Sequence, residues 1–487
     1  MCKNTVPPRF KENRVRHRTC RFEAEPFNFM KTRSLVLIFT LILFPSLGIR
    51  AEELPPLPEG PLLLTSITPE QLSPDYWVNR LPHPEALLKT PEEIRILNQE
   101  IRTTLTTQAD VFSLEGRRRG KDIRDPLELE YETVKGRILF DVDGQKIPAG
   151  LFEQKIKPLM RWENVPAEIK VGWGVATRST SVRALPSEVR MLEEIGDIEF
   201  DMLQYTLIKL WTPVGIYHVS GDGQWYYVQA PYVRGWVRAR DIALFSSRAE
   251  MKKYADFYGG TAGFLTVTGE SAWIFSDPRF QRKFQSPSMG TMIPLAEKTP
   301  GALAVWMPFR GEGGKVRLSK KYLPSASDLS EGFLPYTQRN VIRQAFKLLG
   351  TRYGWGGMYG GRDCSAFTQD VFLPFGIAMP RQSQDQIFAG TQINHFAPLK
   401  EPEAKAVAIR SGTPGVTLMR MPLHQMIYLG EVNGRFYAIH STWAERISMT
   451  SDEKRRINQV VVSDLTLNGN SYLGSLFDRI IAVSEVL

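Results

Sequence analysis

Residues 353–372 read YGWGGMYGGRDCSAFTQDVF, a glycine-rich approach to a cysteine that is followed by an apolar pattern. After Cys364 the apolar residues have helical spacing, at Ala366, Phe367, Val371 and Phe372, and Pro374 closes the segment. We therefore predict that Cys364 lies in the first turn of a helix. The unpaired N–H groups of a helix N-terminus favour a thiolate, so the position predicts a reactive thiol with a lowered pKa. The alternative is a cysteine that is packed on an amphipathic helix and has no reactive role.

Two histidines downstream could serve this thiol as a base and its orienting partner. His424 opens a predicted strand, Asn433-Gly434 turns the chain, and the returning strand reaches His440. A two-residue Asn-Gly loop would place the two histidines on opposite faces of the sheet. A three-residue loop with Gly434 in the left-handed conformation places His440 opposite Met426, on the face of His424. We predict the three-residue loop, because one imidazole can then orient the other beside the thiol.

Helix-start signals mark the segments before the cysteine. Thr90, Pro91 and Glu93 form a capping box with proline in the first helical position. Thr337 can cap a second helix, whose apolar side consists of Val341, Ile342, Ala345, Leu348 and Leu349 and which ends at Gly350. We interpret residues 52–170 as a supporting domain of helices and loops.

From about residue 171 the pattern changes to short strands separated by turns. Asp222-Gly223 is a hairpin signal, and aromatic strands follow at residues 224–228 and 235–237. This pattern predicts a small barrel, in which the aromatic residues either fill the core or line a ligand groove. Residues 259–330 have a similar texture without a repeat of individual residues.

An uncharged, mostly apolar run of 16 residues at positions 34–49 is typical of a secretory signal. Two basic residues precede it, and Ala51 and an acidic, Pro-rich stretch follow. The run is short for a membrane span of about 20 residues, and an uncleaved anchor is the alternative. Met30 is a natural start for such a signal, so we interpret residues 1–29 as a misassigned upstream extension.

The same leader carries most of the net charge of +9. The first 51 residues contain ten Lys or Arg and three Asp or Glu, so the remainder is nearly neutral. We therefore expect no nucleic-acid partner. Two of the three cysteines, Cys2 and Cys20, lie in the leader as well, which leaves an exported chain with a lone thiol at Cys364.

The last segment resembles the NlpC-type family of murein endopeptidases within the papain-like clan. Five pieces carry the resemblance: Y-x-W-G-G at 353–357, D-C-S at 363–365, P-R-x-S-x-x-Q at 380–386, H-x-x-I-Y-L-G at 424–430 and the second histidine at 440. The two strand-rich segments resemble tandem bacterial SH3-like domains, which precede the peptidase in multi-domain family members together with an amino-terminal stabilising domain. The resemblance implies a helical N-terminal region, two small SH3-like β-barrels and an α+β papain-like catalytic domain. The expected boundaries are 30–51 for the signal, 52–170 for the stabilising domain, 171–250 and 251–330 for the barrels and 331–487 for the peptidase domain.

The resemblance also implies roles for individual residues. Cys364 would be the nucleophile, His424 the general base and acid, and His440 the residue that orients His424. The main-chain N–H of Cys364 would help to form the oxyanion site, which suits a helix N-terminus. Tyr353 would line the cleft near the thiol.

Three further residues would hold the amino-terminal end of a stem peptide, by the same resemblance. They are Asp363, Ser365 and Ser383, and a carboxylate suits a terminal ammonium. A plain helix N-cap is the alternative for Asp363, and a local turn hydrogen bond is the alternative for Ser383. We interpret Arg381 and Gln386 as structural.

Two departures from the family pattern concern the catalytic segment. Ala366 stands where the family usually has glycine, and the two histidines are 16 residues apart, a wider spacing than usual. Alanine adds one methyl group and favours a helix, and the longer spacing lengthens both strands equally. We therefore expect activity to survive both departures.

The function implied by the resemblance is that of an exported cysteine endopeptidase. It would hydrolyse the γ-D-glutamyl–diamino acid amide of murein stem peptides through an acyl-enzyme on Cys364, without a metal or other cofactor. We expect a monomer in the periplasm or cell envelope, with murein stem peptides or the cell wall as partner and no membrane contact unless the signal stays uncleaved. The alternatives are a non-catalytic wall-binding SH3-like protein and a papain-like amidase or acyltransferase acting on another substrate.

Overall fold

The computed structural model describes residues 57, 60–261, 263–396 and 401–487. The predicted upstream extension at 1–29 and the predicted signal peptide at 30–51 lie outside the described residues. In the described part of the chain, no helix combines the length and the apolar character needed to cross a membrane.

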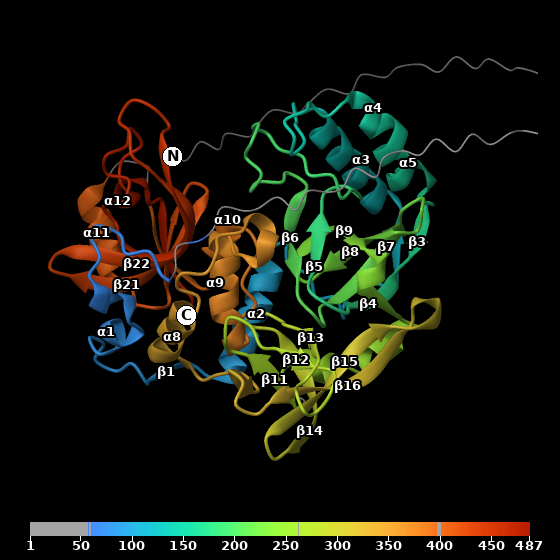
Figure 1. Cartoon of the computed structure of the whole chain (residues 1–487), viewed down its shortest axis with the longest axis horizontal. Helices are drawn as coiled ribbons and strands as arrows, with labels where there is room; N and C mark the ends of the chain where they lie inside the picture. Colours follow the sequence, from blue (N-terminus) through green and yellow to red (C-terminus); the bar gives the residue numbers. More distant parts are fainter. Residues whose placement is uncertain (1–56, 58–59, 262, 397–400) are drawn as a thin grey trace, which may run out of the picture. The chain divides into compact units, whose positions relative to one another are not determined.

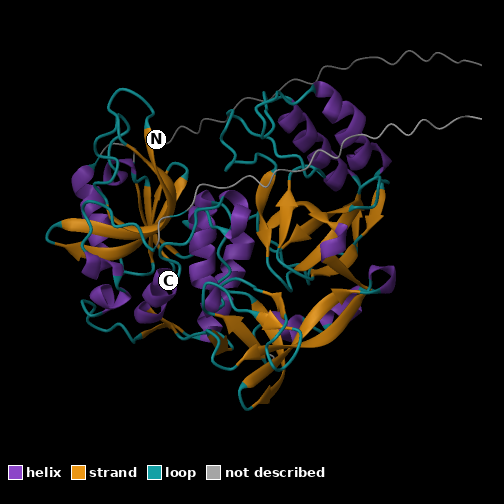
Figure 2. Ribbon diagram, viewed as in Figure 1, coloured by secondary structure: helices purple, strands orange, loops and turns teal. Residues whose placement is uncertain are grey.

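The last segment folds as an antiparallel sheet covered by helices (Figures 1 and 2). In spatial order its strands are β19 Thr391–His395, β24 Ala482–Glu485, β20 Thr417–Met421, β21 His424–Val432, β22 Arg435–Arg446 and β23 Lys454–Asp464. Its helices are α8 Gln338–Phe346, α9 Cys364–Phe372, α10 Ser383–Gln386, α11 Pro402–Ser411 and α12 Leu476–Arg479. Phe367 of α9 packs in one buried cluster with Ile427 of β21 and Ile439 of β22, so the cysteine-bearing helix lies against the histidine-bearing strands.

Side-chain caps fix where the predicted helices begin. The Thr337 hydroxyl accepts a hydrogen bond from the main-chain N–H of Asn340 at 3.2 Å and starts α8. The Asp363 carboxylate accepts one from the main-chain N–H of Ala366 at 2.9 Å and starts α9. The capping box at Thr90 starts α2, Pro91–Thr104. All three predicted helix starts are confirmed, because each depends on contacts within one turn.

The prediction placed one additional, unpaired residue in the loop between β21 and β22. The structure places this residue within strand β21 instead. Val432 pairs with Arg435, so the loop is the two-residue Asn433-Gly434 turn, with φ of 51° and 73°. A bulge between Tyr428 and Gly430 then shifts the register by one residue. The predicted three-residue loop is wrong, because the tight turn needs positive φ at both positions and Asn-Gly supplies it.

Beyond the bulge, the register agrees with the prediction. Ile427 pairs with Ile439. If the same register is continued by one residue, His440 lies opposite Met426. Met426 packs in a buried cluster with Ala438 and Phe436, whereas Ile427 and Ile439 pack on the other face of the sheet. His424 and His440 therefore share a face, as predicted.

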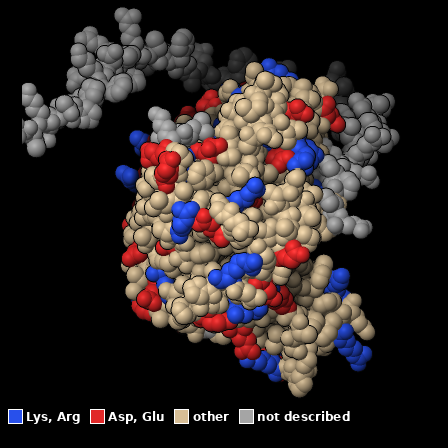
Figure 3. All heavy atoms as spheres, turned by 90° about the vertical axis from the view of Figure 1, so that its left-hand side faces the viewer, with Lys and Arg blue, Asp and Glu red and all other residues tan. Residues whose placement is uncertain are grey.

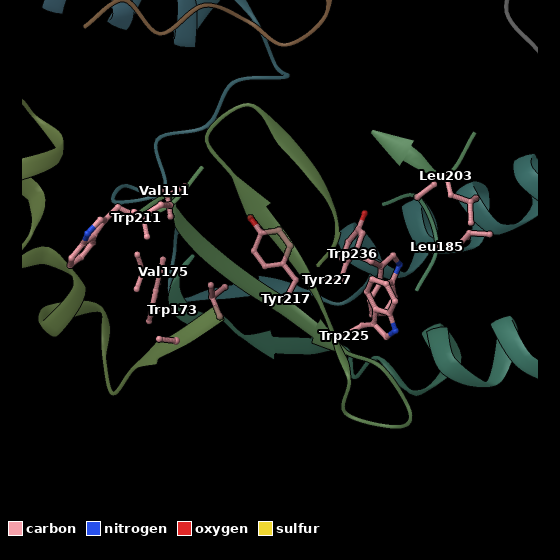
Figure 4. Packing of buried hydrophobic residues seen from close by; sticks show 14 of the residues in the cluster. Val111, Trp173, Val175, Leu185, Leu203, Trp211, Tyr217, Trp225, Tyr227 and Trp236 are labelled. Carbon is pink, nitrogen blue, oxygen red and sulfur yellow. The ribbon is translucent and has the colours of Figure 1, made fainter. Parts of the chain in front are cut away.

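The first strand-rich segment forms an antiparallel sheet that closes around aromatic side chains. Its strands in spatial order are β10 Ile242–Phe245, β4 Gly172–Ala176, β7 Pro213–Val219, β8 Trp225–Ala230, β9 Val233–Arg238, β5 Thr180–Arg183 and β6 Gln204–Ile208. Figure 4 shows Trp225, Tyr227 and Trp236 packed together inside it. All three are buried, so these aromatic residues belong to the core and do not line a groove.

The second strand-rich segment shares its core with the first. In spatial order it contains β13 Lys283–Gln285, β12 Ile274–Phe275, β16 Val316–Pro324, β15 Ala302–Arg310, β14 Met292–Thr299, β11 Phe264–Val267 and β17 Leu329–Glu331. The short helices α6 Arg248–Lys252 and α7 Ala255–Tyr258 connect the two segments. Trp211 of the first segment is buried and donates a hydrogen bond from its ring nitrogen to the carbonyl of Trp306 in β15 at 3.0 Å. Val305 and Trp211 lie in one apolar cluster, so the segments pack as one body.

The predicted supporting domain over residues 52–170 is divided between two cores. Trp77 of α1, Pro74–Val78, and Ile101 of α2 pack in the apolar cluster of the last segment. Strand β1, Leu87–Lys89, pairs with β18, Tyr336–Thr337. Tyr131 of α3, Lys121–Lys135, packs instead in the core of the strand-rich segments, beside α4 Ala149–Leu151, α5 Lys157–Met160 and the paired strands β2 Arg117–Arg119 and β3 Glu168–Lys170. The apolar faces of these helices are visible in the sequence, but their packing partners are not.

Charges of both signs are interspersed on the face of the molecule drawn in Figure 3. Lys and Arg side chains alternate there with Asp and Glu side chains, without a large area of one sign. This face offers no basic surface for a polyanion.

Candidate active site

Cys364, His424 and His440 line one cavity of about 430 Å³, and Tyr353 lines it with them. The thiol comes from the first turn of α9, and the imidazoles come from β21 and β22. The structure therefore brings together these four of the predicted site residues. Asp363, Ser365 and Ser383 are not among the residues that line this cavity.

The two imidazoles form a hydrogen-bonded line that ends at a serine. Nε2 of His424 lies 2.8 Å from Nδ1 of His440, and Nε2 of His440 lies 2.9 Å from the hydroxyl oxygen of Ser463 on β23. His440 is 1% exposed, so its ring orientation is fixed by packing as well as by these contacts. The sequence pattern did not identify Ser463 as a site residue. Its trace in the sequence is a small polar residue that directly follows the apolar run at 460–462.

Two assignments of protons fit this line, because the Ser463 hydroxyl can donate or accept, and one of them suits a base at His424. In that one, Nε2–H of His424 donates to Nδ1 of His440, and Nε2–H of His440 donates to Ser463. This assignment leaves Nδ1 of His424 without a proton, which is the state that a general base requires. His440 acts on the thiol only through His424, and is therefore a positioning residue.

Burial keeps both histidines neutral. Burial, together with the nearby Arg479 guanidinium, lowers the pKa of His424 to about 4. Burial also places the pKa of His440 well below its ordinary value. Both imidazoles are therefore neutral at pH 7, in agreement with the proton assignment.

Burial also raises the pKa of the Cys364 thiol to about 12, and the Asp363 carboxylate raises it in the same direction. Hydrogen bonds from the main-chain N–H groups of Gln425 and Ser365 to the sulfur act against this increase. The lowered pKa predicted from the helix N-terminus is therefore wrong, because the loss of solvent around the thiol outweighs the favourable N–H groups.

The pH dependence of alkylation tests this protonation state. Because iodoacetamide reacts with the thiolate, the rate at Cys364 is expected to rise about tenfold per pH unit between pH 5 and pH 8, without a plateau. The measurement is mass spectrometry of alkylated protein over time at each pH. A rate that stays level over this range would instead show a thiolate–imidazolium pair with His424.

Asp363 is fully engaged within the protein. Its Oδ1 accepts hydrogen bonds from the N–H of Ala366 at 2.9 Å and the hydroxyl of Ser365 at 3.1 Å. Its Oδ2 accepts from the N–H of Gly356 at 3.0 Å and pairs with the guanidinium of Arg381. The ion pair and these hydrogen bonds hold the pKa of the Asp363 carboxyl below its ordinary value, although burial acts in the opposite direction. The N-cap contact anticipated for this residue is therefore present.

Arg381 connects the first turn of α9 to the first strand-rich segment. Its Nη1 donates to the Ser365 hydroxyl at 2.7 Å, and its Nε donates to the Thr206 hydroxyl of β6 at 2.7 Å. Gln386 donates from Nε2 to the carbonyl of Ser365 at 2.8 Å. These contacts agree with the interpretation of Arg381 and Gln386 as structural. Ser383 begins the short helix α10 and is half-buried.

The glycines before the cysteine allow the backbone to approach β6. Gly357 has φ of 83°, and a Cβ there would lie 2.6 Å from Cγ of Leu207. The side chain of Gln204 donates to the carbonyl of neighbouring Gly356 at 2.9 Å. This close approach joins two parts of the chain, the segment before Cys364 and strand β6.

A loop of the first strand-rich segment forms one wall of the cavity. Phe200 lies against Trp355 and Trp443, with ring centroids 5.5 Å and 5.2 Å away. Carboxylates on the same loop also line the cavity, at Glu193, Glu194 and Asp197. Burial and the adjacent carboxylate of Glu194 raise the pKa of Asp197. No motif in the sequence connects this loop with Cys364.

Basic side chains also line the cavity, and Arg479 differs from the others. Arg446 and Lys454 line the cavity and pair with Asp452 at 2.6 Å and 2.9 Å. Arg479 of α12 lines it too, and among the described residues it has no ion-pair partner, while its Nη1 is buried without a hydrogen-bond partner. A buried donor left unpaired is costly, so Arg479 is suited to bind an anionic group that enters the cavity.

Among the described residues, no group of three or more His, Cys, Asp and Glu side chains is arranged to hold a metal ion. The chemistry that the described groups can perform is nucleophilic attack by the thiol, with His424 accepting and returning the proton.

Two family models match parts of this chain. The NlpC/P60 family model matches residues 350–465, which span Cys364, both histidines and Ser463, and an SH3 domain model of SH3b1 type matches residues 191–238. A solved structure titled as a novel NlpC/P60 endopeptidase from Photobacterium damselae subsp. piscicida superposes with a TM-score of 0.68 at 17% identity, over 84% of this chain and 96% of that one.

A curated relative named gamma-D-glutamyl-L-lysine dipeptidyl-peptidase, from Bacillus cereus, is 28% identical over 187 residues. The match covers 38% of this chain and 51% of the relative, so the chain spans about half the length of that protein. From the two family models, the chain contains an NlpC/P60 family domain preceded by an SH3b domain.

Proposed function

We propose that this chain is an exported cysteine endopeptidase that hydrolyses the γ-D-glutamyl–diamino acid amide of murein stem peptides. The observation that carries the proposal is the line from His424 through His440 to Ser463 in a cavity shared with Cys364. The name of the Bacillus cereus relative supports the type of amide bond. The signal-like run at 34–49 supports export to the periplasm or cell envelope.

The proposed reaction starts from a neutral thiol and a neutral imidazole. As the Cys364 sulfur attacks the amide carbonyl carbon, its proton passes to Nδ1 of His424, and the main-chain N–H of Cys364 donates to the oxyanion. The new imidazolium then protonates the leaving amine, and the C–N bond breaks to give a thioester. A water molecule, deprotonated by His424, attacks the thioester and releases the acid and the thiol.

Acidic and basic residues that line the cavity suit the two charged groups of a short stem peptide. We propose that the free ammonium of the peptide lies against Glu194 and Asp197, which the SH3b loop presents to the cavity. In the same proposal, the D-Glu α-carboxylate of the peptide, which is next to the scissile amide, lies against Arg479. In this proposal Asp363 and Ser365 position the first turn of α9, and a free peptide is preferred to intact murein because the loop forms a wall.

Product analysis of a defined peptide tests the proposal. Mass spectrometry of L-Ala-γ-D-Glu-meso-diaminopimelate after incubation with the protein is expected to show release of L-Ala-D-Glu. The matched peptide with an acetylated amino terminus is expected to react at least about tenfold more slowly, because it lacks the charge-assisted contacts. Cleavage at another bond, or no cleavage of either peptide, would contradict the proposal.

Replacing Arg479 with glutamine tests the carboxylate contact. The substitution is expected to raise KM about 10- to 100-fold for the peptide whose D-Glu α-carboxylate is free, because a hydrogen bond to a charged group is lost. The peptide in which this carboxylate is amidated serves as the matched control, and its KM is expected to change little. An equal change for both peptides would place the carboxylate elsewhere.

Replacing Ser463 with alanine tests the hydrogen-bonded line. Nε2–H of buried His440 then loses its acceptor, so kcat is expected to fall about tenfold while KM changes little. Ser463→Thr keeps the hydroxyl and is expected to recover most of the loss. Unchanged kcat in the alanine variant would show that Ser463 does not position His440.

A further inference from the structure

A second cavity, of about 520 Å³, lies on the opposite side of α9 from the catalytic cavity. Cys364 lines the catalytic cavity, whereas Ala366, Gln369 and Asp370 of the same helix line the second one. The strand-rich segments provide the remaining walls, and the two cavities have no lining residue in common. We name this second space the junction cavity, defined by α9, Arg362, Lys209, Trp211, Ser286 and Tyr258.

Two cations in the junction cavity share a single buried carboxylate. Asp370 accepts from Lys209 Nζ at 2.8 Å through Oδ1 and from Arg362 Nε at 2.7 Å through Oδ2. Glu270 also lines the cavity, but its side chain is exposed, and it contacts Arg362 through its main-chain oxygen at 3.2 Å. Burial lowers the pKa of Lys209, while the Asp370 carboxylate acts in the opposite direction. With Lys209 protonated, the buried part of the site carries one excess positive charge.

Unpaired donors line the same space. Arg362 is only 4% exposed, yet its Nη1 has no hydrogen-bond partner among the described residues. The same is true of the Ser286 hydroxyl and of Nε2 of Gln108, which also line the junction cavity. A buried donor left unpaired is costly, so a ligand whose acceptor oxygens reach these donors would relieve several costs together.

Part of the remaining wall is apolar and includes Trp211, Phe257, Leu373 and Met379, and hydroxyl side chains such as Ser271, Ser288 and Thr291 lie beside them. A concave, largely apolar space with a few convergent polar groups is the usual form of a small-molecule site. We propose that the junction cavity binds a small amphipathic oxyanion, with its charged group on Arg362 and its apolar body against Trp211. The site is separate from the proposed peptidase reaction and does not depend on it.

Calorimetry with matched probes tests the proposal. N-acetyl-L-phenylalanine and phenyl phosphate carry an oxyanion on an aromatic body, and N-acetyl-L-phenylalaninamide is the uncharged match of the first. The full chain with Cys364 carboxymethylated, which blocks the catalytic cavity, is expected to bind at least one oxyanion about 10- to 100-fold more tightly than the amide. Tighter binding of the carboxylate or of the phosphate identifies which oxyanion the site takes.

Two variants locate the binding. Arg362→Gln is expected to remove the preference for the oxyanion over the amide. If this variant fails to fold, Ser286→Phe, which fills the cavity from the second strand-rich segment, is expected to abolish binding and to leave peptide hydrolysis intact. Three results would overturn the proposal: equal binding of acid and amide, no binding of any probe at millimolar concentration, which would mean a cavity filled only with water, or undiminished binding in Ser286→Phe.

Discussion

Replacing Cys364 with alanine is expected to lower kcat/KM for the stem peptide by at least about 10³-fold. The thiol is the nucleophile in the proposed reaction, and the cavity contains no second cysteine among its lining residues. Without the sulfur no thioester forms, and only the oxyanion site and substrate binding remain to assist attack by water. The measurement is the initial rate of dipeptide release, followed by mass spectrometry at several substrate concentrations.

The control for this variant is its stability. Cys364 is 8% exposed, and the change to alanine removes one small atom, so the midpoint of urea unfolding is expected to move little. Cys364→Ser is the closer match in shape and is expected to be as inactive, because a serine hydroxyl in this buried position ionises less readily than a thiol. Wild-type rates in either variant would assign the hydrolysis to another group.

Replacing Arg381 with methionine is expected to lower the free energy of unfolding by about 3–5 kcal/mol. The guanidinium is 7% exposed, pairs with the buried Asp363 carboxylate, and donates to Ser365 and Thr206. Its loss leaves a buried charge without a partner at the first turn of α9. Urea unfolding followed by tryptophan fluorescence measures the change.

A second arginine provides the matched control for Arg381. Arg410 pairs with Glu431 at 2.7 Å, but its side chain is 55% exposed, so solvent weakens the ion pair. Arg410→Met is therefore expected to change the free energy of unfolding by less than about 1 kcal/mol. Equal effects of the two substitutions would contradict the assignment of Arg381 as the link between the first turn of α9 and β6.

The parts of the site that depend on local sequence could be predicted. Asp363 caps α9 and puts Cys364 in its first turn, and both facts follow from contacts within four residues. The hairpin between His424 and His440 follows from strand alternation and an Asn-Gly turn. The position of the bulge could not be predicted, because a bulge at Gly430 and a longer loop give the same facing of the histidines.

The parts that depend on distant packing could not be predicted. Asp197 and Phe200 reach the cavity of Cys364 from a loop of the first strand-rich segment, and Arg479 reaches it from a short helix near the C-terminus. Residues 52–170 show amphipathic helices, but the division of these helices between two cores is decided by surfaces far away in the sequence. Burial also raises the pKa of Cys364, where the helix N-terminus predicted a lowered one. How far a thiol is buried depends on residues that are distant in the sequence.

The central claim is that Cys364 forms a thioester with the substrate. The most direct measurement is mass spectrometry of protein quenched in acid during turnover of L-Ala-γ-D-Glu-meso-diaminopimelate, followed by peptide mapping. The account predicts an L-Ala-D-Glu acyl group on the peptide that contains Cys364, and none in Cys364→Ala. Turnover with the acyl group on a different residue, or turnover that persists in Cys364→Ala, would contradict it.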